Sequence, residues 1–116
     1  MAAAKTKRAL ALCGASAALL SASVLGAAPA LADTMVVAWA HGNVHADGPA
    51  VSERVVSYVN PGYSYTAQCW LEGDLVTDLG ITNRNWVRLK LNSGGIGYVS
   101  AIYLKGNDKG NVPNHC

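Results

Sequence analysis

From about residue 35 onward, apolar and polar residues alternate in short segments that are separated by Gly, Asn, Asp and Pro. A period of two is typical of β-strands, and no long segment shows the 3.6-residue apolar period of a helix. The pattern predicts five strands over 35–40, 51–59, 63–71, 86–91 and 96–99. Residues 43–45 either continue the first strand or form a short strand of their own.

The segments between the strands have the composition of tight turns. Turns are predicted at 47–49, 60–62 and 92–95, and a single 3₁₀ turn at 100–103, after which Leu104 resumes extended structure. The connector 72–85 is too apolar for a free loop, and we expect it to fold back as an irregular mini-hairpin. The fold class expected is all-β: a small antiparallel barrel of five to six strands in one domain.

Two tryptophans lie on the polar side of their strands. Trp86 shares its phase with Arg88 and Lys90, and Trp70 shares its phase with Ser64, Thr66 and Gln68, opposite Tyr65, Ala67, Cys69 and Leu71. If 63–71 pairs with 86–91 in a register near 70 opposite 86, the two rings are cross-strand neighbours. They form either an open ligand platform or a small satellite core, roofed by Leu75, Leu79 and Ile81 of the connector.

Residues 1–32 have the layout of a secretory signal peptide. Lys5, Lys7 and Arg8 precede an uncharged run over 9–28, and Ala30-Leu31-Ala32 fits a cleavage site. The alternative interpretation is a membrane anchor. Cys13 follows Leu12 and lies close to Arg8, so we interpret it as a small hydrophobic residue of the signal rather than a lipid-modified cysteine.

Cleavage after residue 32 changes the charge and the cysteine count. The remaining 84 residues (33–116) keep six of the nine basic and all seven acidic residues, so the net charge is −1. Nothing then favours nucleic acid or an anionic membrane as a partner. Cys69 and Cys116 remain, and an exported chain would pair them as a disulfide, the alternative being two free thiols.

Candidate chemistry is sparse. His41, His45 and Asp47 lie close in sequence, but in an extended segment the two imidazoles are about 13 Å apart, too far to share a metal ion. The acidic residues of the connector lack the regular oxygen spacing of a calcium loop. Nucleophile-elbow and phosphate-loop motifs do not occur. We therefore expect no enzyme activity, no metal and no cofactor.

Three motifs in order resemble bacterial SH3-like domains. NVHADGP (43–49) is similar to their N-V-R-S-G-P-S signature, although His45 replaces the Arg and Asp47 lengthens the turn. NPG (60–62) matches a Gly-bearing turn, and WVRL (86–89) with GYVSAIYL (97–104) resembles their closing segment. The two cysteines also resemble small secreted actinobacterial members. The resemblance covers about residues 36–105 and implies an SH3-like barrel that binds peptidoglycan peptides or other extracellular ligands without chemistry of its own.

Two functional hypotheses follow. The first is a secreted, monomeric, non-catalytic module that holds a cell-wall peptide between the loop from His45 through Asp47 to Pro49 and a wall formed by Trp70 and Trp86, with Tyr63 contributing. The second is a secreted inhibitor or signalling protein that docks on another protein. The connector 72–85 discriminates between them, because a projecting connector with an apolar tip favours a protein partner. A connector that packs on Trp70 and Trp86 weakens both hypotheses.

Overall fold

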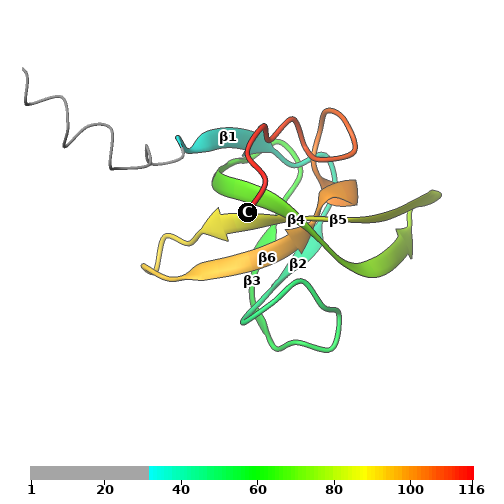
Figure 1. Ribbon diagram of the computed structural model, residues 1–116, viewed down its shortest axis with the longest axis horizontal. Helices are drawn as coiled ribbons and strands as arrows, with labels where there is room; N and C mark the ends of the chain where they lie inside the picture. Colours follow the sequence, from blue (N-terminus) through cyan, green and yellow to red (C-terminus); the bar gives the residue numbers. More distant parts are fainter. Residues whose placement is uncertain (1–31) are drawn as a thin grey trace, which may run out of the picture. The chain divides into compact units, whose positions relative to one another are not determined.

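The computed structural model describes residues 32–116. The predicted signal segment, including Cys13, lies outside these residues except for Ala32. Six strands and one 3₁₀ helix follow in order: β1 (Thr34–Val37), β2 (Gly42–His45), β3 (Val55–Val59), β4 (Ser64–Asp78), β5 (Ile81–Lys90), β6 (Ile96–Ser100) and η3 (Ala101–Tyr103). The strands form one antiparallel sheet in the order β1-β4-β5-β6-β2-β3, which curls into a half-barrel (Figure 1). The predicted all-β fold class is confirmed.

The core lies on the inner face of the curled sheet. It is built from small and β-branched residues, which suit a closely packed pleated surface. β5 supplies Val87 and Leu89, and the neighbouring β6 supplies Val99. Its remaining buried members are Val36, Ala38, Val44, Val59, Ala67, Ala101, Leu104 and Val112.

The closing hairpin and the 3₁₀ turn match their prediction. Backbone hydrogen bonds between Leu91 and Gly95 and from Gly94 to Leu91 form the turn at 92–95. The side chain of Ser100 accepts a hydrogen bond from the backbone N–H of Ile102 at 3.3 Å and so caps η3. Leu104 is extended and bridges Ala38.

The predicted strand 51–59 is too long at its N-terminal end, because 51–54 form turns and only Val55–Val59 are a strand. The backbone N–H of Val51 donates to a carboxylate oxygen of Asp74 at 3.0 Å, and Glu53 donates to the carbonyl of Ala50 at 3.1 Å. Local turn bonds thus override the β-propensity of this segment.

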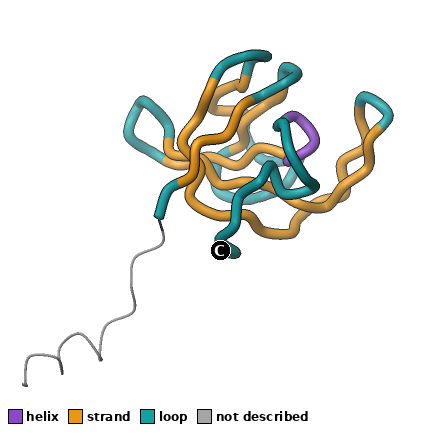
Figure 2. Tube along the Cα trace, turned by 90° about the horizontal axis from the view of Figure 1, so that it is seen from above, coloured by secondary structure: helices purple, strands orange, loops and turns teal. Residues whose placement is uncertain are grey.

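The connector 72–85 folds back as a hairpin, as predicted, and its pairing is irregular between Glu72 and Val76. β4 and β5 continue through it as paired strands as far as Asp78 opposite Ile81, and they form a projecting hairpin of residues 73–84, which we call the arm. Its turn residues Leu79 and Gly80 have φ values of 55° and 76°. Two successive positive φ values are the signature of a type I′ turn, which matches the twist of two long strands. Figure 2 shows the arm extending away from the rest of the sheet.

A β-bulge overturns the predicted pairing of Trp70 with Trp86. Ala67 lies opposite Leu89 but Cys69 lies opposite Arg88, so β4 has one extra residue, Gln68. One extra residue moves every following side chain to the other face of the sheet. Consequently Trp70 pairs with Val87 and Trp86 with Leu71, and the two indoles lie on opposite faces.

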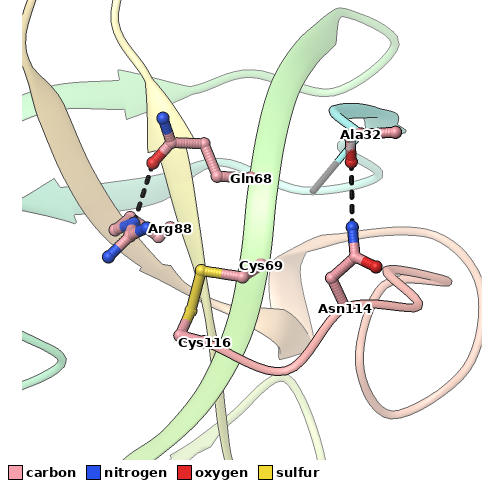
Figure 3. The surroundings of a disulfide bond; sticks show 6 residues. All are labelled: Ala32, Gln68, Cys69, Arg88, Asn114 and Cys116. Carbon is pink, nitrogen blue, oxygen red and sulfur yellow. Dashed lines mark hydrogen bonds between the residues drawn. A yellow bond between two sulfur atoms is a disulfide. The ribbon is translucent and has the colours of Figure 1, made fainter. Parts of the chain in front are cut away.

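The predicted disulfide joins Cys69 of β4 to Cys116 across 47 positions of sequence (Figure 3). Two backbone bonds of 2.8 Å accompany it, from Trp70 N–H to the carbonyl of Asn114 and from Cys116 N–H to the carbonyl of Trp70. His115 stacks on the Trp70 ring at 4.1 Å between centroids, and the Lys109 ammonium lies 4.7 Å from that ring. The C-terminal tail (residues 105–116) is therefore an ordered layer that covers Trp70.

Candidate functional site

Trp86 is a structural residue covered by the base of the arm. Its side chain is 1 % exposed, and its indole N–H donates to the carbonyl of Asp74 at 2.9 Å. A second irregularity in β4, between Glu72 and Val76, brings Asp74 over the ring. A Cβ at Gly73 would lie 2.2 Å from the carbonyl of Pro49, so this close approach requires glycine. The connector covers Trp86 while the tail covers Trp70, and no open platform of two tryptophans exists.

The other predicted site residues are dispersed. His45 is buried, its Nδ1 lies 2.8 Å from the carbonyl of Glu53, and its ring meets Trp86 edge-on at 5.6 Å. Asp47 is exposed, with φ of 55°, and lies 3.9 Å from Arg54. Tyr63 is 66 % exposed on another part of the surface. Of the five predicted residues, only His45 and Trp86 are in contact.

A small hollow of about 160 Å³ lies beside these two residues, with Tyr103 in its lining. The Tyr103 hydroxyl donates to a carboxylate oxygen of Asp78 at 2.9 Å, which ties the arm to η3. Burial, followed by this hydrogen bond and the negative charge of Asp78, raises the pKa of Tyr103 to about 12. Tyr103 is therefore protonated near neutral pH, and its hydroxyl holds Asp78 of the arm.

A hollow of about 610 Å³ lies between the arm, η3 and the tail, and we call it the Trp39 cleft. Trp39 is 40 % exposed, and Ile81 of the arm is 39 % exposed. An apolar cleft with an accessible indole and a few polar groups is the usual form of a ligand site. The cleft is lined by Trp39, Ile81, Thr82, Asn83, Ala101, Ile102, Leu104, Lys105, Gly106, Asn107 and Asp108.

Hydrogen bonds hold the walls of the cleft in place. The Trp39 indole N–H donates to the carbonyl of Ile102 at 2.7 Å, and its backbone N–H donates to the carbonyl of Tyr103 at 3.0 Å. Across the cleft, the Asn83 amide donates to the carbonyl of Asp108 at 2.7 Å. The three segments are therefore fixed before any ligand arrives, which lowers the entropy lost on binding.

The two charged residues that line this cleft, Asp108 and Lys105, differ in their ion pairing. One carboxylate oxygen of Asp108 lies 3.4 Å from the Lys109 ammonium, and the other accepts from the Asn85 amide at 3.3 Å. Lys105 is exposed and takes part in none of the ion pairs found within residues 32–116. The cleft therefore offers one cationic group that lacks an internal ion-pair partner.

A second hollow of about 560 Å³, the tyrosine groove, lies between β3, the start of β4 and the 92–95 turn. Tyr58, Tyr63 and Tyr65 line it together with Met35 and Val56. Its one basic residue, Lys90, is 3.1 Å from Asp33 and is therefore already paired. The groove includes the predicted Tyr63, but it lacks both an indole and an unpaired charge.

Sequence reasoning missed Trp39. Its segment, MVVAWA (35–40), has the pattern of an ordinary strand, and alternation does not show that the ring stands at the edge of a cleft formed by residues 81–108. The number of tryptophans is a further signal for Trp39. The chain has three, and the fold covers the other two, Trp70 and Trp86.

Across residues 32–116, no three His, Cys, Asp or Glu side chains group in a way that could hold a metal ion. That part of the chain likewise contains no helix of the length and apolarity needed to cross a membrane. No family model, curated protein or solved structure matches this chain.

Proposed function

We propose that the protein is a secreted, non-catalytic binding module that holds an extracellular peptide, such as a cell-wall peptide, in the Trp39 cleft. The observation that carries the proposal is the accessible Trp39 ring, fixed by its bond to Ile102 and facing a cleft that Ile81 lines from the arm. Indoles in preformed apolar sites are the side chains that most often dominate binding energy.

Two features support an extracellular setting. The first 32 residues have the charge and apolar pattern of an export signal. The Cys69–Cys116 disulfide belongs to an oxidising compartment, since thiols are kept reduced in the cytosol. The SH3-like sequence motifs add the expectation of a peptide ligand from the cell wall.

The polar groups of the cleft favour binding over chemistry. Asn83, Asn85 and Asp108 are occupied with one another or with Lys109. Tyr103 is held protonated by Asp78 and lines the neighbouring small hollow. A catalytic site instead requires a nucleophile or base that is free to reach its substrate.

Sedimentation with purified peptidoglycan tests the proposal. Wild type is expected to co-sediment, and Trp39→Ala to lose at least tenfold in affinity, since a binding hot spot contributes about 2 kcal/mol or more. Tyr63→Ala, in the tyrosine groove, is the matched control and should bind as wild type does. Thermal unfolding of each variant separates lost binding from lost folding. If the wild-type protein stays in the supernatant, wall binding is contradicted. If Tyr63→Ala alone loses binding, the ligand site is the tyrosine groove and not the Trp39 cleft.

A second candidate function is docking on another protein, and the arm favours it. The arm projects, and Leu79 at its tip is 52 % exposed, while Leu75 nearer its base is 51 % exposed. Leu79 also adopts a left-handed conformation, which disfavours a bulky side chain by about 1–2 kcal/mol. Leu79 thus exposes apolar surface to water and strains the backbone, and such a residue is expected where a binding partner covers it.

Cross-linked pull-downs from culture medium, with wild type and Leu79→Asn as paired baits, test this candidate. Asn tolerates the same turn conformation, so the fold is kept while the apolar tip is removed. A protein captured by wild type and lost with Leu79→Asn supports docking through the arm. Identical captures by the two baits would exclude the tip as the docking element.

A further inference from the structure

We infer that the Trp39 cleft selects a ligand carrying a carboxylate at the end of an apolar peptide, with Lys105 as the counter-charge. The inference rests on the proposed function and specifies the chemistry of its ligand. Three observations carry it: the position of Lys105 in the fold, the charge left unpaired in the cleft, and the apolar surface beside that charge.

The backbone fixes the place of Lys105. Its N–H donates to the carbonyl of Val37 at 2.8 Å, next to the bridge between Ala38 and Leu104. Leu104 is 4 % exposed and packs in the core, so the lysine leaves the body at a defined point on the rim of the cleft. The side chain is flexible, but its origin lies beside the segment that carries Trp39.

Charge complementarity gives the sign of the ligand. Three acidic residues of the described chain lie near cations: Asp33 near Lys90, Asp47 near Arg54 and Asp108 near Lys109. Asp108 is the one acidic residue that lines the cleft, and both of its carboxylate oxygens have partners. The cleft is therefore net positive when Lys105, Asp108 and Lys109 are counted together, and an anionic group is the ligand feature that it attracts.

The apolar surface of the Trp39 cleft indicates which kind of anion the cleft can bind. Trp39 and Ile81, which are 40 % and 39 % exposed, offer aromatic and hydrocarbon surface beside a single ammonium group. One lysine acts as a point charge that suits one carboxylate, whereas a polyanion such as a phosphate polymer requires a cluster of basic residues. A peptide that ends in small apolar residues places its terminal carboxylate at Lys105 while its side chains contact Trp39.

The test compares native peptidoglycan, freed of anionic polymers, with the same material after its carboxylates are converted to methylamides. Wild type should bind the native material about fivefold more tightly, the upper range of an exposed ion pair. Lys105→Gln should bind the native material about fivefold more weakly than wild type and no longer distinguish the two. Lys90→Gln, which removes a cation from the tyrosine groove, should behave as wild type.

The outcomes separate this inference from the function on which it rests. If wild type binds neither preparation, the proposed function fails. If it binds both equally, or if Lys105→Gln still discriminates, the carboxylate assignment fails and the binding function stands.

A soluble pair identifies which carboxylate is recognised: the tetrapeptide N-acetyl-Glu-Leu-Ala-Ala as its terminal acid and as its terminal amide. Both forms keep the glutamate side chain, so a preference for the acid supports recognition of the terminus. Equal binding of the two forms by wild type would assign the contact to a side-chain carboxylate and overturn the terminal assignment.

Discussion

Removal of the disulfide should destabilise the fold strongly while leaving the sheet connectivity intact. The substitution is Cys116→Ser, which frees the tail from β4. A crosslink across 47 positions restricts the unfolded chain, and the loop-entropy relation gives about 4 kcal/mol for its loss. Small domains have total stabilities of about 5–15 kcal/mol, so this change removes a large share.

The assay is thermal unfolding followed by circular dichroism without reductant. In a domain of this size, 1 kcal/mol shifts Tm by roughly 4–8 °C, so Cys116→Ser should lower Tm by about 15–30 °C. Wild type treated with dithiothreitol should match the variant. His115→Ala keeps the crosslink and removes only the stacking on Trp70, so its Tm should fall by about 8 °C or less.

A different result would refute the reasoning. If Cys116→Ser unfolds within about 5 °C of wild type, the two backbone bonds between the tail and Trp70 must hold the tail without the crosslink. The unfolded-state argument would then not apply to this chain. If the variant is less stable but dithiothreitol leaves wild type unchanged, the effect comes from the serine and not from the crosslink.

Three further predictions concern the arm and its contacts. Trp86→Ala should lower the free energy of unfolding by about 3–5 kcal/mol in urea titrations, since it empties a fully buried site; a loss below about 1 kcal/mol would contradict the burial. In a phenolate absorbance titration, Tyr103 should ionise near pH 12, and Asp78→Asn should lower its pKa. Because the pKa of Tyr103 is raised in the folded state, the stability that protonated Tyr103 contributes is complete below pH 10 and is lost as the pH rises toward 12. An unchanged Tyr103 titration in Asp78→Asn would contradict the hydrogen bond between Tyr103 and Asp78. Leu79→Gly should raise stability by about 1 kcal/mol by relieving the left-handed leucine, and a decrease would show that the tip packs on the body.

The sequence predicted the elements whose signals are local. Alternation identified segments in five of the six strands and left open whether 43–45 forms a separate strand, as β2 does, and Gly94 with Gly95 indicated the closing turn. The two cysteines within residues 33–116 allow one pairing, and Cys69–Cys116 is that pair. These features depend on neighbouring residues or on a count, so no tertiary information is needed to predict them.

The candidate site was not predictable in the same way, because it depends on register. A single bulged residue, Gln68, moved Trp70 and Trp86 to opposite faces, and alternation alone cannot locate such a residue. Trp39, Ile81 and Lys105 line one cleft only because the arm, the segment after β1 and the segment after η3 converge. The site predicted from the sequence and the candidate site in the structure therefore both contain tryptophan, but not the same one.

The most direct measurement uses the three indole N–H groups as reporters in a ¹H–¹⁵N NMR spectrum of the protein titrated with soluble peptidoglycan fragments. The proposed function predicts that the Trp39 signal shifts in a saturable manner, because its ring lines the open cleft. The signals of Trp70, covered by the tail, and Trp86, bonded to Asp74, should stay in place. Saturable shifts of Trp70 or Trp86 with Trp39 unchanged, or no shift of any indole, would contradict the Trp39 cleft as the binding site.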